Sequence, residues 1–285
     1  MIQTLSNSED IRVISSILKV MGEQKNSCFA PYISDFLYSD DKELVCQAVN
    51  TLGKCSTDLA VDALVSRAGA DSSLDKEIVN ALSAIKSDKS IKALTAFLSS
   101  ASSSLRNNVR TALAALKERA IPNLVSGLSS KNKNIVILNL NILGETGVIE
   151  AVKPIRKFLQ AMPSDPNIRF AAYEALGLLP SKTGAYTLTQ GLLDEDEGVR
   201  IAAARAVNQQ FDHLYERGVA NVFAAEENRE LIVDALLTAE SNKVVSCLIH
   251  NPEFNNCAMK VLKARRDKDL LNFYIGLAKN INLSC

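Results

Sequence analysis

The residue types that most often carry metal or acid–base chemistry are few in this chain. There are two histidines, His213 and His250. His250 lies between Cys247 and Cys257, and these three side chains are the nearest approach to a ligand set. Their spacing matches no zinc-binding pattern, and no GxSxG, P-loop, GxGxxG or HExxH motif occurs. We therefore expect no metal, no cofactor and no enzymatic activity.

Four consecutive acidic residues, 194–197, form a carboxylate cluster. Paired carboxylates can act as general acid and base when burial raises the pKa of one of them. These four lie in a polar turn directly before an apolar helical pattern. In that place carboxylates cap the helix and face the positive end of its dipole. Capping is therefore favoured over catalysis.

Five basic residues gather near the end of the sequence. They are Lys260, Lys263, Arg265, Arg266 and Lys268. They could bind the phosphates of a nucleic acid, or they could form the solvated end of a helix, which is favoured. Lysine plus arginine and aspartate plus glutamate both number 32, whereas nucleic-acid-binding chains usually carry a basic excess.

A repeat of about 31 residues runs through the first 208 residues. Each unit ends in a small or polar marker residue after an apolar helical pattern. The markers are Gly22, Gly53, Lys86, Lys117, Gly144, Gly177 and Asn208. Residues one, four and five positions before each marker are nearly all apolar, which indicates one face of a helix. A second apolar stripe in steps of three and four precedes most of them. Paired helices at this period predict an all-α solenoid.

The ends of these helices can also be predicted. Capping residues stand twelve positions before four of the markers: Asp41, Asn132, Asp165 and Asp196. Leu74 and Leu105 occupy that position in two middle repeats, where serine-rich loops should replace the cap. Glycine or asparagine at a marker predicts a left-handed residue at the helix end. Lys86 and Lys117 break this rule, so the two helices that end there are expected to end more loosely or in a different conformation.

The segments DPNIRFAAYEALG (165–177) and DEGVRIAAARAVN (196–208) resemble HEAT repeats, in particular the short bacterial form known from phycobilin lyases. The resemblance covers roughly residues 10–208. It implies a right-handed superhelix of stacked antiparallel helical hairpins. It also maps the family's turn aspartate and helix arginine onto Asp165 with Arg169 and Asp196 with Arg200. HEAT arrays serve many unrelated functions.

Two regions are predicted. Residues 1–208 form the array with an N-terminal capping helix, and residues 209–285 form divergent helical repeats that close it. Helices in the second region are expected at 228–239, 243–250, 254–265 and 267–280. The start MIQTLSNSEDIRV lacks the features of a signal peptide, and no apolar run is long enough to span a bilayer. We expect a cytoplasmic protein with reduced cysteines.

The resemblance places the second helix of each hairpin on the concave side. Positions three and six before the markers would then line a groove. The predicted partner-binding residues are Gln47, Asn50, Asn80, Leu138, Asn141, Glu174 and Arg205. They could equally be solvated helix positions. The run 135–138 is apolar on all sides, so that helix is either covered on both faces or carries an exposed apolar patch.

These features predict a non-catalytic scaffold or adaptor that presents a concave helical surface to a protein partner. Two alternatives remain open. One is an enzyme subunit of the HEAT-like lyase type, which follows from the resemblance. The other is a nucleic-acid-binding HEAT protein that uses the basic C-terminal helix.

Overall fold

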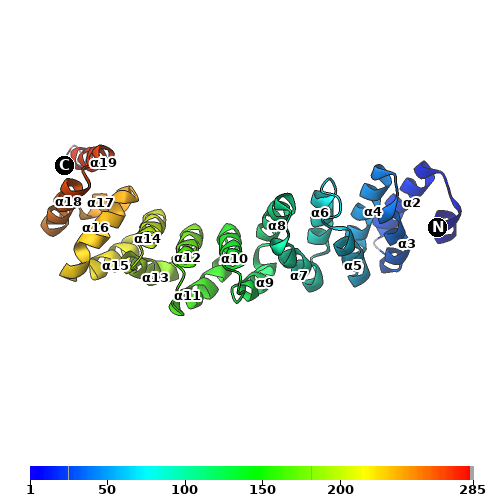
Figure 1. Cartoon of the computed structure of the whole chain (residues 1–285), viewed down its shortest axis with the longest axis horizontal. Helices are drawn as coiled ribbons and strands as arrows, with labels where there is room; N and C mark the ends of the chain where they lie inside the picture. Colours follow the sequence, from blue (N-terminus) through cyan, green and yellow to red (C-terminus); the bar gives the residue numbers. More distant parts are fainter. Residues whose placement is uncertain (25, 181, 283–285) are drawn as a thin grey trace. The chain divides into compact units, whose positions relative to one another are not determined.

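The computed structural model describes residues 1–24, 26–180 and 182–282 (Figure 1). Every regular element within these ranges is a helix. The chain divides into two compact units, Met1–Ser129 and Ser130–Cys285. This division reflects where contacts cluster, whereas the sequence boundary at residue 208 reflects where the repeat pattern weakens. The predicted all-α architecture is confirmed.

The helices of the first unit alternate between two layers. One layer holds α2 (Ile11–Gln24), α4 (Lys42–Cys55), α6 (Asp75–Ile85) and α8 (Ser103–Ala115). The other holds α3 (Ala30–Ser34), α5 (Asp58–Arg67), α7 (Asp88–Ala96) and α9 (Ile121–Gly127). The short α1 (Ile2–Asn7) precedes them, and 3-10 turns lie at Ser27–Phe29, Asp35–Tyr38, Phe97–Ser99 and Lys117–Arg119. Each helix of the α2–α8 layer packs on the next, as stacked hairpins require.

The second unit repeats this alternation. One layer holds α10 (Lys133–Glu145), α12 (Pro166–Leu178), α14 (Glu197–Gln210), α16 (Arg229–Thr238) and α18 (Pro252–Arg265). The remaining helices are α11 (Val152–Gln160), α13 (Ala185–Gln190), α15 (His213–Phe223), α17 (Asn242–Leu248) and α19 (Lys268–Asn282). Further 3-10 turns lie at Ile149–Ala151, Lys182–Gly184, Gly191–Leu193 and Glu226–Asn228. The four helices expected after residue 208 form, and α15 is an additional one.

The apolar stripes form the core that the repeat predicts. All residues one and four positions before the seven markers are buried. Five positions before them, only Ile17 and Ala112 are half-buried. The first-helix stripes are buried as well, among them Ile91, Leu94 and Leu98. Burial on one face of each helix in both layers is what holds a stacked array together.

The glycine markers do not end helices, and in this the sequence prediction is wrong. Gly53 and Gly144 lie inside α4 and α10. A Cβ on Gly53 would lie 2.9 Å from Ala81 Cα, and one on Gly144 would lie 2.8 Å from Ala175 Cα. These glycines therefore let the next helix of the layer pack directly against the backbone. The repeat therefore uses glycine at these positions for its small size and not for its backbone freedom.

After Gly53 and Gly144, a left-handed residue stands three positions further along the chain. Ser56 has φ 52° and Gly147 has φ 67°. Lys86 and Lys117, which the sequence rule excluded, are left-handed too, with φ 56° and 51°. Lys86 and Lys117 are thus equivalent to Ser56 and not to the glycine at position 53. The predicted markers of α6 and α8 are wrong by three residues.

The corrected markers are Ser83 in α6 and Ala114 in α8. They restore an even spacing of 30, 31 and 30 residues from Gly53 to Gly144. They also place Asp71 and Ser102 twelve positions before the marker. Asp71 accepts a hydrogen bond from the Ser73 amide at 2.9 Å, and Ser102 Oγ accepts one from the Leu105 amide at 3.2 Å.

The four predicted caps are confirmed. In each, a side-chain oxygen accepts a hydrogen bond from a backbone amide two or three residues later. The pairs are Asp41 with Leu44 at 2.8 Å, Asn132 with Asn134 at 3.0 Å, Asp165 with Asn167 at 2.9 Å and Asp196 with Val199 at 3.0 Å. Each of these bonds satisfies an amide that has no partner within its own helix. The hairpin turns are therefore fixed by local sequence.

Candidate functional site

A groove of about 450 Å³ lies between α6 and α8. Helix α6 contributes Lys76, Asn80, Ser83 and, just past its end, Lys86. Helix α8 contributes Asn108, Thr111 and the small side chains Ala112 and Ala115. The groove thus runs along two neighbouring helices of one layer and lies wholly within the first unit.

The identity of residue 83 explains why a groove opens here. Glycine occupies the equivalent place in α4, α10 and α12, and in each of these the next helix comes into backbone contact. Serine at position 83 has a Cβ and a hydroxyl, which need space between the helices. Helix α6 accordingly packs less closely on α8 than on α4. The Ser83 hydroxyl is buried and has no hydrogen-bond partner.

The electrostatic character of the groove is positive. Lys76 and Lys86 are exposed, and no carboxylate is among the described residues that line it. Arg119 adds a third cation near one end, where its Nη1 donates to the Lys86 carbonyl at 3.4 Å. Asn80 and Thr111 are exposed beside these charges. The groove therefore offers ammonium, amide and hydroxyl groups together.

Three residues from the predicted groove rows lie in this groove: Asn80, Ser83 and Thr111. Two other predicted residues, Gln47 and Asn50, are on α4 and lie outside it. Gln47 is half-buried, and its Nε2 donates to Thr51 Oγ1 of the same helix at 3.4 Å. Asn50 is exposed. The structure therefore brings one of the seven predicted binding residues, Asn80, into the groove.

The remaining four predicted residues lie in the second unit. Leu138 and Asn141 are half-buried on α10. In the apolar run 135–138, Val136 is buried and the other three residues are half-buried, so the run is largely but not fully covered. Arg205 Nη1 lies 3.9 Å from Glu174 Oε1, which pairs α14 with α12. These two helices pack closely, since a Cβ on Gly177 of α12 would lie 2.9 Å from Ala206 Cβ of α14.

Sequence reasoning missed Lys76, Lys86 and Asn108. The missed signal was the absence of glycine at residue 83. With Lys86 taken as the marker, Ser83 counted as an ordinary surface position. Its real place is the point of closest approach between helices. Correcting the register by three residues would have indicated that α6 and α8 pack less closely than α4 and α6.

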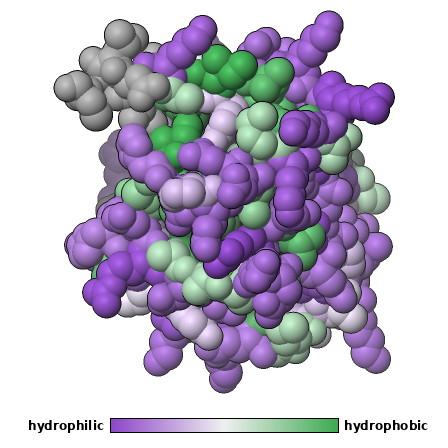
Figure 2. Space-filling view, turned by 90° about the vertical axis from the view of Figure 1, so that its left-hand side faces the viewer, coloured by the Kyte–Doolittle hydropathy of each residue, from purple (hydrophilic) through white to green (hydrophobic). Residues whose placement is uncertain are grey.

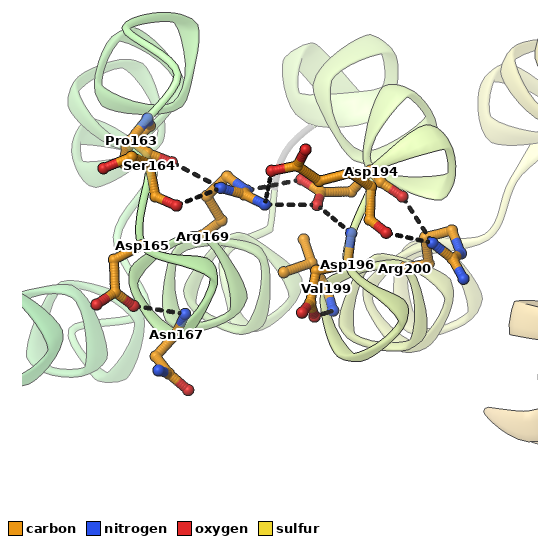
Figure 3. A network of polar contacts seen from close by, with 10 residues as sticks. Pro163, Ser164, Asp165, Asn167, Arg169, Asp194, Asp196, Val199 and Arg200 are labelled. Carbon is orange, nitrogen blue, oxygen red and sulfur yellow. Dashed lines mark hydrogen bonds and ion pairs between the residues drawn. The ribbon is translucent and has the colours of Figure 1, made fainter.

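Arg169 joins two consecutive turns (Figure 3). Its Nη1 donates to the carbonyls of Pro163 and Ser164 at 2.8 and 3.0 Å. Its Nη2 and Nε donate to the two carboxylate oxygens of Asp194 in the following turn, both at 2.9 Å. This hydrogen bond to Asp194 raises the pKa of Arg169 above its usual value. The resemblance paired Arg169 with Asp165, but Asp165 caps α12 instead.

The acidic cluster 194–197 is part of the same network. Arg200 Nη1 donates to the carbonyls of Asp194 and Glu195 at 2.8 and 3.0 Å. Asp196 caps α14, and Glu197 lies 2.7 Å from Arg265. The expected capping role is therefore confirmed for Asp196, whereas Asp194 and Glu197 pair with arginine side chains.

The basic cluster near the C-terminus is partly neutralised. Lys260 Nζ lies 2.9 Å from Glu230, and Arg265 lies 2.6 Å from Asp234. Lys263, Arg266 and Lys268 are exposed, and within the described ranges no ion pair involves them. Figure 2, which views the end of the chain at α18 and α19, shows a mainly hydrophilic surface. The cluster offers less free positive charge than its sequence indicates.

The candidate ligand set around His250 is not assembled in the part of the chain that the structure covers. No three histidine, cysteine, aspartate or glutamate side chains come together there as a metal site needs. Cys247 donates from its thiol to Glu216 Oε1 at 3.2 Å. Burial, followed by the nearby Glu216 carboxylate, raises the pKa of Cys247 to about 11. None of the helices described has both the length and the apolar character that crossing a bilayer requires.

Comparison with known proteins bears on the fold. A family model described as HEAT repeats matches residues 121–208. No curated protein sequence matches the chain. Among solved structures, an engineered protein is 16% identical with a TM-score of 0.33, over 99% of this chain and 98% of that one. Human deoxyhypusine hydroxylase in complex with glycerol is 18% identical with a TM-score of 0.36, over 84% of this chain and 94% of that one. At these scores neither likeness supports a conclusion about function.

Proposed function

We propose that this chain, whose residues 121–208 are HEAT repeats, is a non-catalytic scaffold that binds a segment of a protein partner in the α6–α8 groove. The observation that carries the proposal is the groove itself. At Gly53, Gly144 and Gly177 the missing side chain lets the next helix come into backbone contact, whereas beside Ser83 a space remains, lined by lysine, asparagine, threonine and alanine side chains.

The groups in the groove are suited to binding a polypeptide. The side-chain amides of Asn80 and Asn108 each offer donors and an acceptor, as a peptide backbone does. The buried hydroxyl of Ser83 has no partner within the protein. Because these groups are held on two rigid helices, binding would order few side chains and would lose little conformational entropy.

Site-specific photo-crosslinking tests the proposal. A benzophenone side chain at Thr111 would face the groove, and the matched control position is Lys92, exposed on α7 in the other layer. In the native host we expect a discrete protein adduct from position 111 and none from position 92. Ala84→Trp should fill the groove and abolish the adduct. Equal adducts from both positions, or an adduct insensitive to Ala84→Trp, would contradict the proposal.

A further inference from the structure

We infer that the segment bound between α6 and α8 is extended and carries two acidic side chains four to five residues apart. This inference rests on the proposed function and adds the chemistry of the partner. It follows from the charge, the length and the width of the groove.

The charge of the groove calls for an acidic partner. Lys76 and Lys86 have no ion pair among the described residues, and no carboxylate lines the space beside them. Two of the other exposed lysines do have a partner: Lys89 with Asp62 at 2.7 Å and Lys260 with Glu230 at 2.9 Å. Two unpaired ammonium groups facing one groove leave a positive potential that a carboxylate would satisfy.

The spacing of the two lysines sets the spacing of the acids. Ten residues separate Lys76 from Lys86, which corresponds to about 15 Å along a helix. An extended chain advances about 3.3 Å per residue, so four to five residues cover that distance. Between the lysines lie Asn80 on one wall and Asn108 on the other, which can pair with the backbone of such a segment.

The width of the groove favours an extended segment over a helix. Packed neighbouring helices lie about 8–10 Å apart, whereas a helix with its side chains is about 10–12 Å wide. The walls between the lysines carry Ala84, Ala112 and Ala115, whose short side chains leave room for small residues of the bound segment. The favoured ligand therefore has an acid at each end and small residues between them.

The test uses a bead-displayed library of random seven-residue peptides, acetylated and amidated so that their ends carry no charge. The intact chain is screened against this library. We expect selected peptides to be enriched in pairs of aspartate or glutamate four or five residues apart. Replacing both acids of a selected peptide by glutamine should weaken binding about three- to tenfold, the range for two exposed ion pairs.

The variant that removes the groove charge is Lys76→Gln with Lys86→Gln. Its matched control is Lys92→Gln with Lys153→Gln, which changes the net charge equally on the exposed faces of α7 and α11. The groove variant should lose about three- to tenfold affinity for the selected peptides and the control less than twofold. Both should keep the thermal midpoint of the unaltered chain, because all four lysines are exposed.

The outcomes separate this inference from the proposed function. A library without acidic enrichment, or equal losses in the two double variants, overturns the inference while a groove-specific crosslink at Thr111 would still support the scaffold. Loss of that crosslink as well would overturn both. Stronger binding of oligothymidine than of any peptide, sensitive to Lys76→Gln with Lys86→Gln, would show that the groove takes nucleic acid and would also overturn the inference.

Discussion

The helix pairs α10–α12 and α6–α8 belong to the same hairpin repeat but differ in how closely their two helices pack. In the first pair Gly144 lets α12 come so near that a Cβ would lie 2.8 Å from Ala175 Cα. In the second pair Ser83 occupies the same repeat position, and the two helices pack less closely and leave a groove of about 450 Å³ between them. One side chain at the crossing point thus decides whether a helix pair buries its surface or presents it.

The largest expected difference is in the stability lost when a core leucine is truncated beside each of the two helix contacts, at Gly144 and at Ser83. Leu143 on α10 is fully buried, while Leu116 at the end of α8 borders the groove. Leu143→Ala should reduce the free energy of unfolding by about 2–5 kcal/mol, as for other buried leucines. Leu116→Ala should lie at or below the lower end of that range, because water can enter beside it. Urea denaturation measures both, and equal losses would show that the two sites are packed alike.

The crossing position itself gives the next largest effect. Gly144→Ala would place a methyl group against the backbone of α12 and should destabilise by about 1–3 kcal/mol, as overpacking does. Ser83→Ala removes a hydroxyl without a hydrogen-bond partner and should change the free energy of unfolding by less than about 0.5 kcal/mol. A comparable loss for both variants would refute the claim that the two crossings differ in closeness.

A smaller effect of opposite sign is expected at the left-handed helix ends. Lys86 has φ 56°, a conformation that glycine adopts without steric penalty. Lys86→Gly should therefore stabilise by about 0.5–1 kcal/mol. The control is Lys54→Gly in the last turn of α4, which should destabilise by about 0.5–1 kcal/mol because that residue is helical. Thermal melts of the two variants should shift in opposite directions.

The smallest expected effect on stability is at Arg205, in the closely packed pair α12–α14. Its guanidinium lies 3.9 Å from Glu174, and both side chains are about half exposed. Exposed pairs contribute less than about 1 kcal/mol. Arg205→Gln should change the unfolding free energy by about 0.5 kcal/mol or less, and the change should disappear in high salt. A salt-independent loss would indicate that this pair holds α12 and α14 together.

Much of the fold was readable from sequence because its rules are local. Apolar periodicity located the buried stripes, and capping residues such as Asp41 located the turns. The register of α6 and α8 was misread because glycine serves two purposes: it ends helices, and it lets helices touch. Sequence alone favoured the first, and so Lys86 was aligned with Gly53 although its backbone matches that of Ser56.

The groove was harder to predict for a physical reason. Its existence depends on the distance between two helices, and that distance depends on which residue stands at the crossing. Asn80 was among the predicted residues and lines the groove, although it was counted from a marker three residues out of place. Lys76 and Asn108 could be found only after Ser83 was recognised as the crossing residue. The predicted residues Glu174 and Arg205 lie where the helices are closed and pair with each other instead.

The side chain of Arg169 has a consequence for how the second unit opens. It fastens the turn before α12 to the turn before α14 through five hydrogen bonds. In stacked repeats, such nearest-neighbour links determine how many hairpins unfold in one step. Fraying of either turn would break bonds in both. The amide protons of α12 and α14 should therefore exchange with solvent as one cooperative block.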